Sequence, residues 1–280
     1  MPRLVFVDDP LDPRIAEYRD VRERDLVGRQ GAFVAEGEVV LTVLLRSARH
    51  RPVSLLIDER RLAGLTPLLA DLDDAVPVHV VTRPVLDAIV GFPLHRGLLA
   101  FGRREAPRPA ADLLAETPAD AVVVAALGIA NHDNVGGLFR NAAAFGASAV
   151  LLDAHCCDPF YRKALRVSVG HVLSVPSARF AADEDPVALL AAHGFTVLSL
   201  SPRAPERLVD VRVAGRVAVL LGTEGPGLPD DVLARTRAVG IPMAPGVDSL
   251  NVATTAAVVL HHLTATRTPA ATIGRVAPSP

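Results

Sequence analysis

The amino-acid sequence predicts an α/β protein whose carboxyl-terminal part contains a mostly parallel sheet. Apolar runs of strand length alternate with helical patterns along the chain, an order typical of α/β folds. The run 121–127 (AVVVAAL) is apolar throughout, as strands covered on both faces of a parallel sheet are. With 280 residues, 50% of them hydrophobic, the chain can bury a large core in one or two domains.

The order of the elements predicts two domains. Residues 1–105 form a smaller α/β domain, and the proline- and arginine-containing residues 106–118 form a linker. The strand–helix pattern then starts again over residues 119–268. We expect residues 269–280 to be a flexible tail.

Each predicted domain has its own series of elements. In the first we expect a solvated helix at 14–29, strands at 53–58, 78–81 and 96–101, and helices at 38–46, 62–72 and 84–90. In the second we expect strands at 121–127, 149–152, 195–200 and 217–221, and helices at 137–145, after 161 and at 189–192. The last unit, 241–262, predicts a short buried strand, a Pro/Gly turn and a helix of small residues that begins near a Ser/Asn pair.

Composition narrows the function classes. A net charge of −2 does not indicate a broadly basic nucleic-acid-binding surface, so any such binding must be local. No apolar run reaches the roughly 18 residues of a membrane span, and the amino terminus does not resemble a signal peptide, so we expect a cytoplasmic protein without a membrane partner. The only cysteines, Cys156 and Cys157, are adjacent, which disfavours a disulfide between them, and no Cys/His spacing predicts a metal site.

Polar loops follow three of the predicted strands. In an open parallel sheet, ligands bind beyond the carboxyl ends of the strands, so we expect these loops to converge. In the first loop, Asn134 is a candidate cap of the helix that follows, and Arg140 lies about 1.7 turns further along. Because an arginine in an apolar segment needs a carboxylate, a phosphate or water, we interpret Arg140 as functional, with a structural ion pair as the alternative.

The second and third loops contribute a glycine-rich turn and a polar helix start. Gly222 and its neighbouring glycines allow a ligand to approach the backbone, although the loop is neither a GxGxxG motif nor a P-loop. Glu224 lies between these glycines and can pair with Arg140. In the third loop, Ser249 or Asn251 either caps the last helix or faces the site. The set contains no strong nucleophile, which favours orientation and polarisation of a reactive partner.

These three loops, in this order, resemble the three motifs of the SpoU/TrmH branch of the SPOUT superfamily of RNA methyltransferases. Residues 134–140 resemble the first motif, 222–227 the second, and 241–243 with 249–252 the third. The match covers about residues 120–265. The amino-terminal part is similar, more loosely, to the family's ribosomal-protein-like substrate-binding domain, on residues 33–37 and 95–97.

The resemblance implies S-adenosylmethionine-dependent 2′-O-methylation of a ribose in structured RNA, with ribosomal RNA favoured over transfer RNA. It also implies a homodimer and a deep trefoil knot in the second domain, an exception to the usual rule that chains do not thread loops. The residues implied to bind the cofactor are Leu200, Ser201, Gly222, Thr223, Ile241, Met243 and Leu250.

The resemblance also implies roles in catalysis and RNA binding. Arg140 is the residue expected to help activate the ribose hydroxyl, with an RNA phosphate as a second candidate to accept the proton. The residues expected to position Arg140 and the ribose are Asn134, Glu224, Ser249 and Asn251. Arg162, Lys163 and Arg166 resemble the family's basic loop toward RNA, and a solvated charge cluster is the alternative.

Two departures from the family pattern leave the substrate nucleotide open. His132 and Asp133 stand where a Pro-Arg or Pro-Gln pair is frequent, and Pro226 stiffens the glycine loop. We therefore keep a non-catalytic RNA-binding or ribosome-assembly protein as an alternative. A Rossmann-like small-molecule enzyme is disfavoured because no GxGxxG loop follows the first strand of the second domain. An antibiotic-resistance methyltransferase has the same architecture and stays open.

Overall fold

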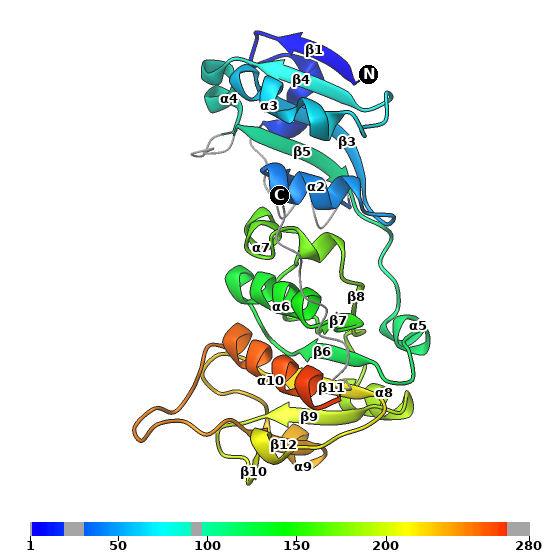
Figure 1. Cartoon of the computed structure of the whole chain (residues 1–280), viewed down its shortest axis with the longest axis vertical. Coiled ribbons are helices and arrows are strands. Elements are labelled where there is room, and N and C mark those ends of the chain that lie inside the picture. The colour runs from blue at the N-terminus through cyan, green and yellow to red at the C-terminus, as the bar shows by residue number, and fades with distance from the viewer. Residues whose placement is uncertain (1, 20–30, 91–96, 268–280) are drawn as a thin grey trace.

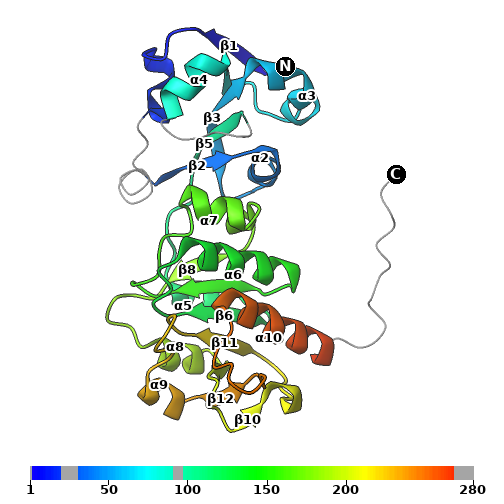
Figure 2. The same cartoon turned by 90° about the vertical axis from the view of Figure 1, so that its left-hand side faces the viewer.

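The computed structural model describes residues 2–19, 31–90 and 97–267. The chain forms two lobes, each built on one sheet, stacked along the long axis of the molecule (Figures 1 and 2). Part of the helix predicted at 14–29, residues 95–96 of the family resemblance and the tail 269–280 lie outside the described residues.

The amino-terminal lobe contains a mixed five-stranded sheet in the order β1-β4-β3-β5-β2. Its strands are β1 (Arg3–Val7), β2 (Ala32–Glu36), β3 (Arg51–Asp58), β4 (Pro77–Val81) and β5 (Leu98–Arg103). Strands β1, β4 and β3 run parallel, whereas β5 pairs antiparallel with both β3 and β2. Its helices are η1 (Pro13–Tyr18), α2 (Glu38–Leu45), α3 (Glu59–Leu69) and α4 (Arg83–Val90). The expected strands β3, β4 and β5 and helices α2, α3 and α4 are confirmed, whereas β1 and β2 were not expected.

The carboxyl-terminal lobe contains a seven-stranded sheet in the order β10-β12-β9-β11-β6-β7-β8, and every pairing in it is parallel. Its strands are β6 (Val122–Ala126), β7 (Ala149–Leu152), β8 (Ser177–Arg179), β9 (Thr196–Leu200), β10 (Glu206–Arg207), β11 (Val217–Leu221) and β12 (Arg237–Gly240). Its helices are α5 (Ala110–Ala115), α6 (His132–Ala144), α7 (Arg162–Val167), η2 (His171–Leu173), α8 (Pro186–Ala192), η3 (Leu208–Asp210), α9 (Asp230–Ala234) and α10 (Val252–Arg267). The predicted α/β class with a parallel sheet is confirmed.

Three local expectations differ from the structure. Helix α6 begins at His132 rather than at 137, because the side chain of Asn131 accepts a hydrogen bond from the Asp133 backbone N–H (2.8 Å) and caps it. The strand expected at Ile241 ends one residue earlier, at Gly240, since Pro242 has no N–H with which to continue a ladder. The segment expected as a linker, 106–118, contains helix α5.

Helices cover both faces of the carboxyl-terminal sheet. Alternate residues of β6 point to opposite faces: Val124 packs in the core beneath α6 and α10, and Val123 in the core beneath α5, α8 and α9. Figure 2 shows α6 and α10 side by side. This close packing depends on Gly137 of α6, where an added Cβ would lie 2.7 Å from the Cβ of Ala253.

The core continues between the two lobes. The ring of Phe33 on β2 lies 5.5 Å from that of Phe160, which precedes α7. The carboxylate of Glu36, at the end of β2, is buried and lies 4.0 Å from Arg162 Nη1 and 3.8 Å from Arg166 Nη1. Helix α7 therefore packs against β2 as well as against α6. Figure 1 shows α7 between the lobes.

We expect Phe139→Ala to lower the free energy of unfolding by about 3–5 kcal/mol, because the fully buried ring on α6 would leave a cavity in the core. The matched control is Phe6→Ala, since Phe6 is 67% exposed, and its change should stay within about 0.5 kcal/mol. Chemical denaturation followed by circular dichroism measures both. Equal losses for the two variants would contradict this assignment of the core.

Candidate active site

The three polar loops meet at one end of the carboxyl-terminal sheet. Asn134, in the first turn of α6, donates a hydrogen bond from its side-chain amide to Glu224 Oε1 in the loop after β11. Asn251, just before α10, donates from Nδ2 to Asn134 Oδ1 (2.8 Å). The expected convergence of the loops is therefore confirmed, with Asn134 in the middle.

Asn134 is not the helix cap that the sequence suggested. Asn131 caps α6, so the side chain of Asn134 is free to bridge the other two loops. Asn134 is only 4% exposed, and a buried amide needs hydrogen-bond partners. The amide nitrogen and the amide oxygen of Asn134 each have one hydrogen-bond partner. The bridge is therefore needed to keep this buried amide paired.

Asn251 has both of the roles that were considered for it. Its Oδ1 accepts from the backbone N–H groups of Ala253 (2.9 Å) and Thr254 (3.2 Å), which caps α10. Its Nδ2 is thereby turned toward Asn134. Ser249 caps nothing: it is exposed, and its hydroxyl donates to Asp248 Oδ1 at 3.3 Å.

Arg140 does not pair with Glu224, contrary to our expectation. It lies six residues after Asn134, and at 100° per residue this places it about 120° around the helix axis from that side chain. Arg140 is exposed, and it makes no side-chain hydrogen bond or ion pair with any other residue in the described ranges. Its guanidinium is therefore available to a group from outside this chain.

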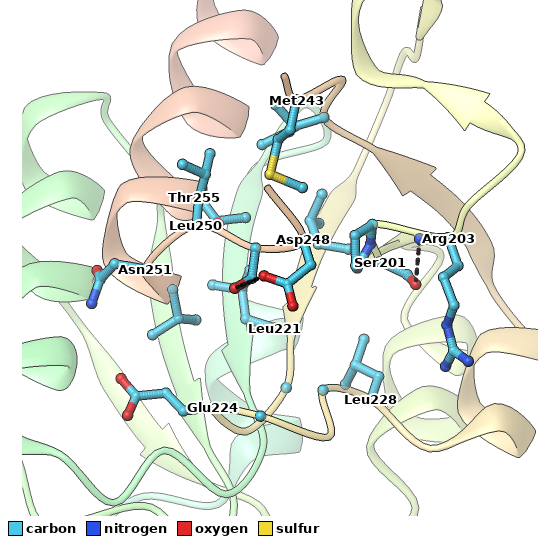
Figure 3. A pocket seen from close by; sticks show the side chains of 18 of the residues that line it. Ser201, Arg203, Leu221, Glu224, Leu228, Met243, Asp248, Leu250, Asn251 and Thr255 are labelled. Atoms are coloured by element: carbon cyan, nitrogen blue, oxygen red, sulfur yellow. Dashed lines mark hydrogen bonds between the residues drawn. The ribbon is translucent and has the colours of Figure 1, made fainter. Parts of the chain in front are cut away.

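A pocket of about 870 Å³ opens beside the Asn251–Asn134–Glu224 chain. It is formed where β9, β11 and β12 end and by the loop before α10, and it contains all seven residues proposed to bind the cofactor: Leu200, Ser201, Gly222, Thr223, Ile241, Met243 and Leu250. Figure 3 shows Glu224 and Asn251 on one side of the pocket and Ser201 and Arg203 on the other. Arg203 and Asp248, which were not among the predicted site residues, also line the pocket.

The glycine loop shapes this pocket by folding tightly on itself. The Thr223 hydroxyl donates to Gly227 O (3.2 Å), and the Gly227 N–H donates to Thr223 O (3.2 Å). A Cβ at Gly222 would lie 2.5 Å from backbone atoms of Gly227 and Leu228, so only glycine fits there. Across the pocket, Leu250 is 41% exposed and presents an apolar side chain to a ligand.

A second cavity, of about 520 Å³, shares Thr223 and Glu224 with the first. Its other side is formed by the loop after β6, by His132 at the start of α6 and by Lys163 of α7. The imidazole of His132 stacks on the ring of Tyr161, with the ring centroids 4.7 Å apart. Sequence reasoning noted His132 only as a departure from the family pattern and did not foresee this cavity.

The three basic residues proposed to bind RNA all lie on the short helix α7 and face acids of this chain. Lys163 Nζ lies 2.7 Å from Asp133 Oδ2, and the guanidinium groups of Arg162 and Arg166 face Glu36. They are thus not a freely solvated cluster. Arg162 and Arg166 contribute to the contact between the lobes, and Lys163 lines the second cavity.

The cysteines do not add a nucleophile to the site. Burial raises the pKa of the Cys156 thiol to about 12 and that of Cys157 to about 11. Within the described ranges no group of three or more His, Cys, Asp or Glu residues could hold a metal ion. No helix in the same ranges is long and apolar enough to cross a membrane.

We expect Gly222→Ala to weaken binding of S-adenosylmethionine, the ligand that the sequence resemblance implies, by about tenfold or more, equivalent to 1.4 kcal/mol. The added methyl group would displace the loop backbone that forms one side of the pocket. Gly64→Ala on α3 is the matched control, because nothing lies within 4 Å of its added Cβ. Isothermal titration calorimetry measures the affinity, and an unchanged value for Gly222→Ala would refute this assignment of the pocket wall.

Comparisons with known proteins agree with this geometry. Residues 121–261 match the family model described as the SpoU rRNA methylase family. An uncharacterised tRNA/rRNA methyltransferase of Mycobacterium bovis is 40% identical over 269 residues, which cover 92% of this chain and 91% of that protein. A relative from Synechocystis, also named as an uncharacterised tRNA/rRNA methyltransferase, is 28% identical over 89% of this chain and 90% of its own.

Solved structures share the fold of nearly the whole chain. An AdoMet-bound rRNA methyltransferase from Sinorhizobium meliloti superposes with a TM-score of 0.78 at 22% identity, over 95% of this chain and 99% of its own. A structure of an RNA 2′-O ribose methyltransferase gives a TM-score of 0.76 at 24% identity, over 94% and 99% of the two chains. Together with the family model and the mycobacterial relative, the three converging motifs establish that this chain belongs to the SpoU rRNA methylase family and is an RNA methyltransferase.

Proposed function

We propose that this RNA methyltransferase transfers the methyl group of S-adenosylmethionine to the 2′-hydroxyl of a ribose in structured RNA, and that ribosomal RNA is its substrate. The observation that carries the proposal is the chain of hydrogen bonds from Asn251 through Asn134 to Glu224 at the edge of the pocket. A site built from amides and one carboxylate, without a nucleophile, suits a reaction in which the substrate hydroxyl attacks.

The residues of the pocket fit S-adenosylmethionine. Its adenine and ribose call for close backbone approach and apolar contact, which the tight Gly222–Gly227 loop and Leu250 provide. Asp248 and Ser201 are polar groups at the same pocket, suited to the charged amino-acid end and the hydroxyls. The bound cofactor supplies an electrophilic methyl group on a sulfonium.

The protein side chains must then orient the ribose hydroxyl and allow its proton to leave. Asn134 holds Glu224 and Asn251 in fixed positions, so that acceptor and donor groups are preorganised at the pocket edge. A guanidinium does not give up its proton in proteins, so Arg140 orients the RNA and stabilises developing charge, and an RNA phosphate accepts the proton.

We expect the purified protein to label ribosomal RNA, and transfer RNA much less, when supplied with radioactive S-adenosylmethionine. A 2′-O-methyl group blocks cleavage of the adjacent phosphodiester by alkali, so partial alkaline hydrolysis should leave one gap in the ladder at the modified position. Label on a base, with an intact ladder, would overturn the ribose assignment. Labelling of transfer RNA alone would overturn the choice of RNA, and cofactor binding with no transfer to either RNA would favour a non-catalytic RNA-binding protein.

We further propose that the protein acts as a homodimer in which Arg140 of one chain completes the site of the other. Arg140 is exposed, lies outside the lining of both cavities and has no partner among the described residues of its own chain. The exposed face of the neighbouring helix α10 contains small or apolar residues, Thr254 and Val258 among them, which suits close packing of a second copy.

A subunit-mixing experiment tests this arrangement. Arg140→Ala and Asn251→Ala should each be inactive alone, because each removes one component of every site. Mixing the two under exchange conditions should restore about a quarter of wild-type methyl transfer, since half of the dimers would then contain one intact site. No recovery, despite exchange verified by native mass spectrometry, would place Arg140 in the site of its own chain.

Three further expectations stay proposals. The first is the deep trefoil knot, which is supported by the way the loops after β9, β11 and β12 gather around one pocket before α10 returns to pack on α6. The second is that the amino-terminal lobe is the ribosomal-protein-like RNA-binding domain, ending near residue 105. The third is a cytoplasmic location.

A further inference from the structure

Two short segments concentrate positive charge in a chain whose net charge is −2. Residues 46–51 contain Arg46, Arg49 and Arg51, and residues 103–108 contain Arg103, Arg104 and Arg108. The only acid in the two segments is Glu105. None of these arginines lines either of the two cavities described above.

The sheet places the two segments side by side. Arg51, the first residue of β3, lies directly opposite Arg103, the last residue of β5. Like charges directly opposite each other on neighbouring strands are destabilising. Both side chains are exposed, and neither makes an ion pair or side-chain hydrogen bond within the part of the chain that the structure describes. An anion between them would relieve the repulsion.

The arginine pair lies at the junction of the two lobes. The Glu105 N–H donates to His50 Nδ1 (3.2 Å), which joins the segment after β5 to the one before β3. Arg49 Nη2 donates to Ser174 O (2.9 Å) in the carboxyl-terminal lobe. Arg104 Nη1 pairs with Asp158 (3.1 Å), also in that lobe. These contacts hold the residues just before Arg51 and just after Arg103, while the side chains of the pair itself are exposed.

The same contacts lead from the arginine pair toward Arg140. The Ser174 hydroxyl lies 3.1 Å from His171 Nδ1, and η2, which begins at His171, packs against both α2 and α6. Burial and then the positive charge of Arg140 lower the pKa of His171. Arginines therefore stand at both ends of this series of contacts, on β3 and β5 at one end and on α6 at the other.

We propose that Arg51 and Arg103 form an anion site for the phosphate backbone of the substrate RNA, at the far end of a track that runs past Arg49 and His171 to Arg140. The proposal rests on the proposed RNA methyltransferase function and adds a binding residue pair to it. Two adjacent arginines suit phosphate because each guanidinium offers paired donors to phosphate oxygens. Contact with the phosphate backbone of the RNA, and not with its bases, also suits recognition of an RNA by shape rather than by base sequence.

The test is RNA binding as a function of salt. We expect Arg51→Gln/Arg103→Gln to bind fluorescein-labelled fragments of ribosomal RNA severalfold more weakly. The slope of log K against log salt should become shallower by about one, because the variant no longer binds the one phosphate that the pair shares. Arg207→Gln/Arg235→Gln is the matched control, because it also removes two partly exposed arginines, which lie by β10 and α9 at the end of the carboxyl-terminal lobe away from the junction (Figure 1), and it should keep the wild-type slope.

Two further measurements keep this proposal separate from the proposed function. Titration with S-adenosylmethionine should give wild-type affinity for the double variant, which shows that the fold and the pocket are intact. Methyl transfer should show a raised KM for RNA and an almost unchanged kcat, because the arginine pair lies outside the reacting groups. An unchanged salt slope in a variant that still methylates RNA would overturn the anion site alone, whereas a wild-type protein that binds RNA and never methylates it would overturn the proposed reaction alone.

Discussion

The arrangement of the site depends on one buried amide. Asn134 accepts from Asn251 and donates to Glu224, so a single side chain connects the start of α6, the loop after β11 and the start of α10. These three segments are far apart in the sequence, and no other side chain hydrogen-bonds to both of the other loops among the described residues. A buried amide left without one partner costs roughly 1–3 kcal/mol, which favours one relative position of the three loops.

Two capping interactions make this bridge available. The side chain of Asn131 accepts from the Asp133 N–H at the start of α6, and that of Asn251 accepts from two N–H groups at the start of α10, so that neither end requires Asn134 as its cap. Because Asn251 caps α10 with its Oδ1, its Nδ2 group is turned toward Asn134. The parallel sheet then sets the distance between the loops, because β6 and β11 are neighbours and the loops that follow them leave the same edge. Local helix chemistry and sheet topology thus position the same polar group.

Much of the fold could be predicted because buried strands have a strong pattern: β6 and β11 are almost wholly apolar and were located within a residue or two. Strands β1 and β10 lie at sheet edges, where pattern is weak, and were missed. The seven residues predicted to bind the cofactor, which line one pocket, followed from motif resemblance. The direction in which the Arg140 side chain points could not be predicted from the motifs. It depends on where α6 begins, and a shift of that start changes which side chains face the pocket. The ion pairs of Arg162 and Arg166 depend on contact between lobes, for which one sequence contains no signal.

The contacts of helix α7 limit which segments could be exchanged between related proteins. Its arginines face Glu36 of the amino-terminal lobe, while Lys163 on the same short helix lines the cavity beside the active site. The two lobes are therefore not independent modules that can be recombined at the segment after β5. A chimaera that takes its first lobe from a relative would need β2 and α7 from the same parent, because a mismatched pair would leave the buried carboxylate of Glu36 without its cations and shift one side of the cavity. The docking of the lobes and the shape of this cavity are in this way inherited together.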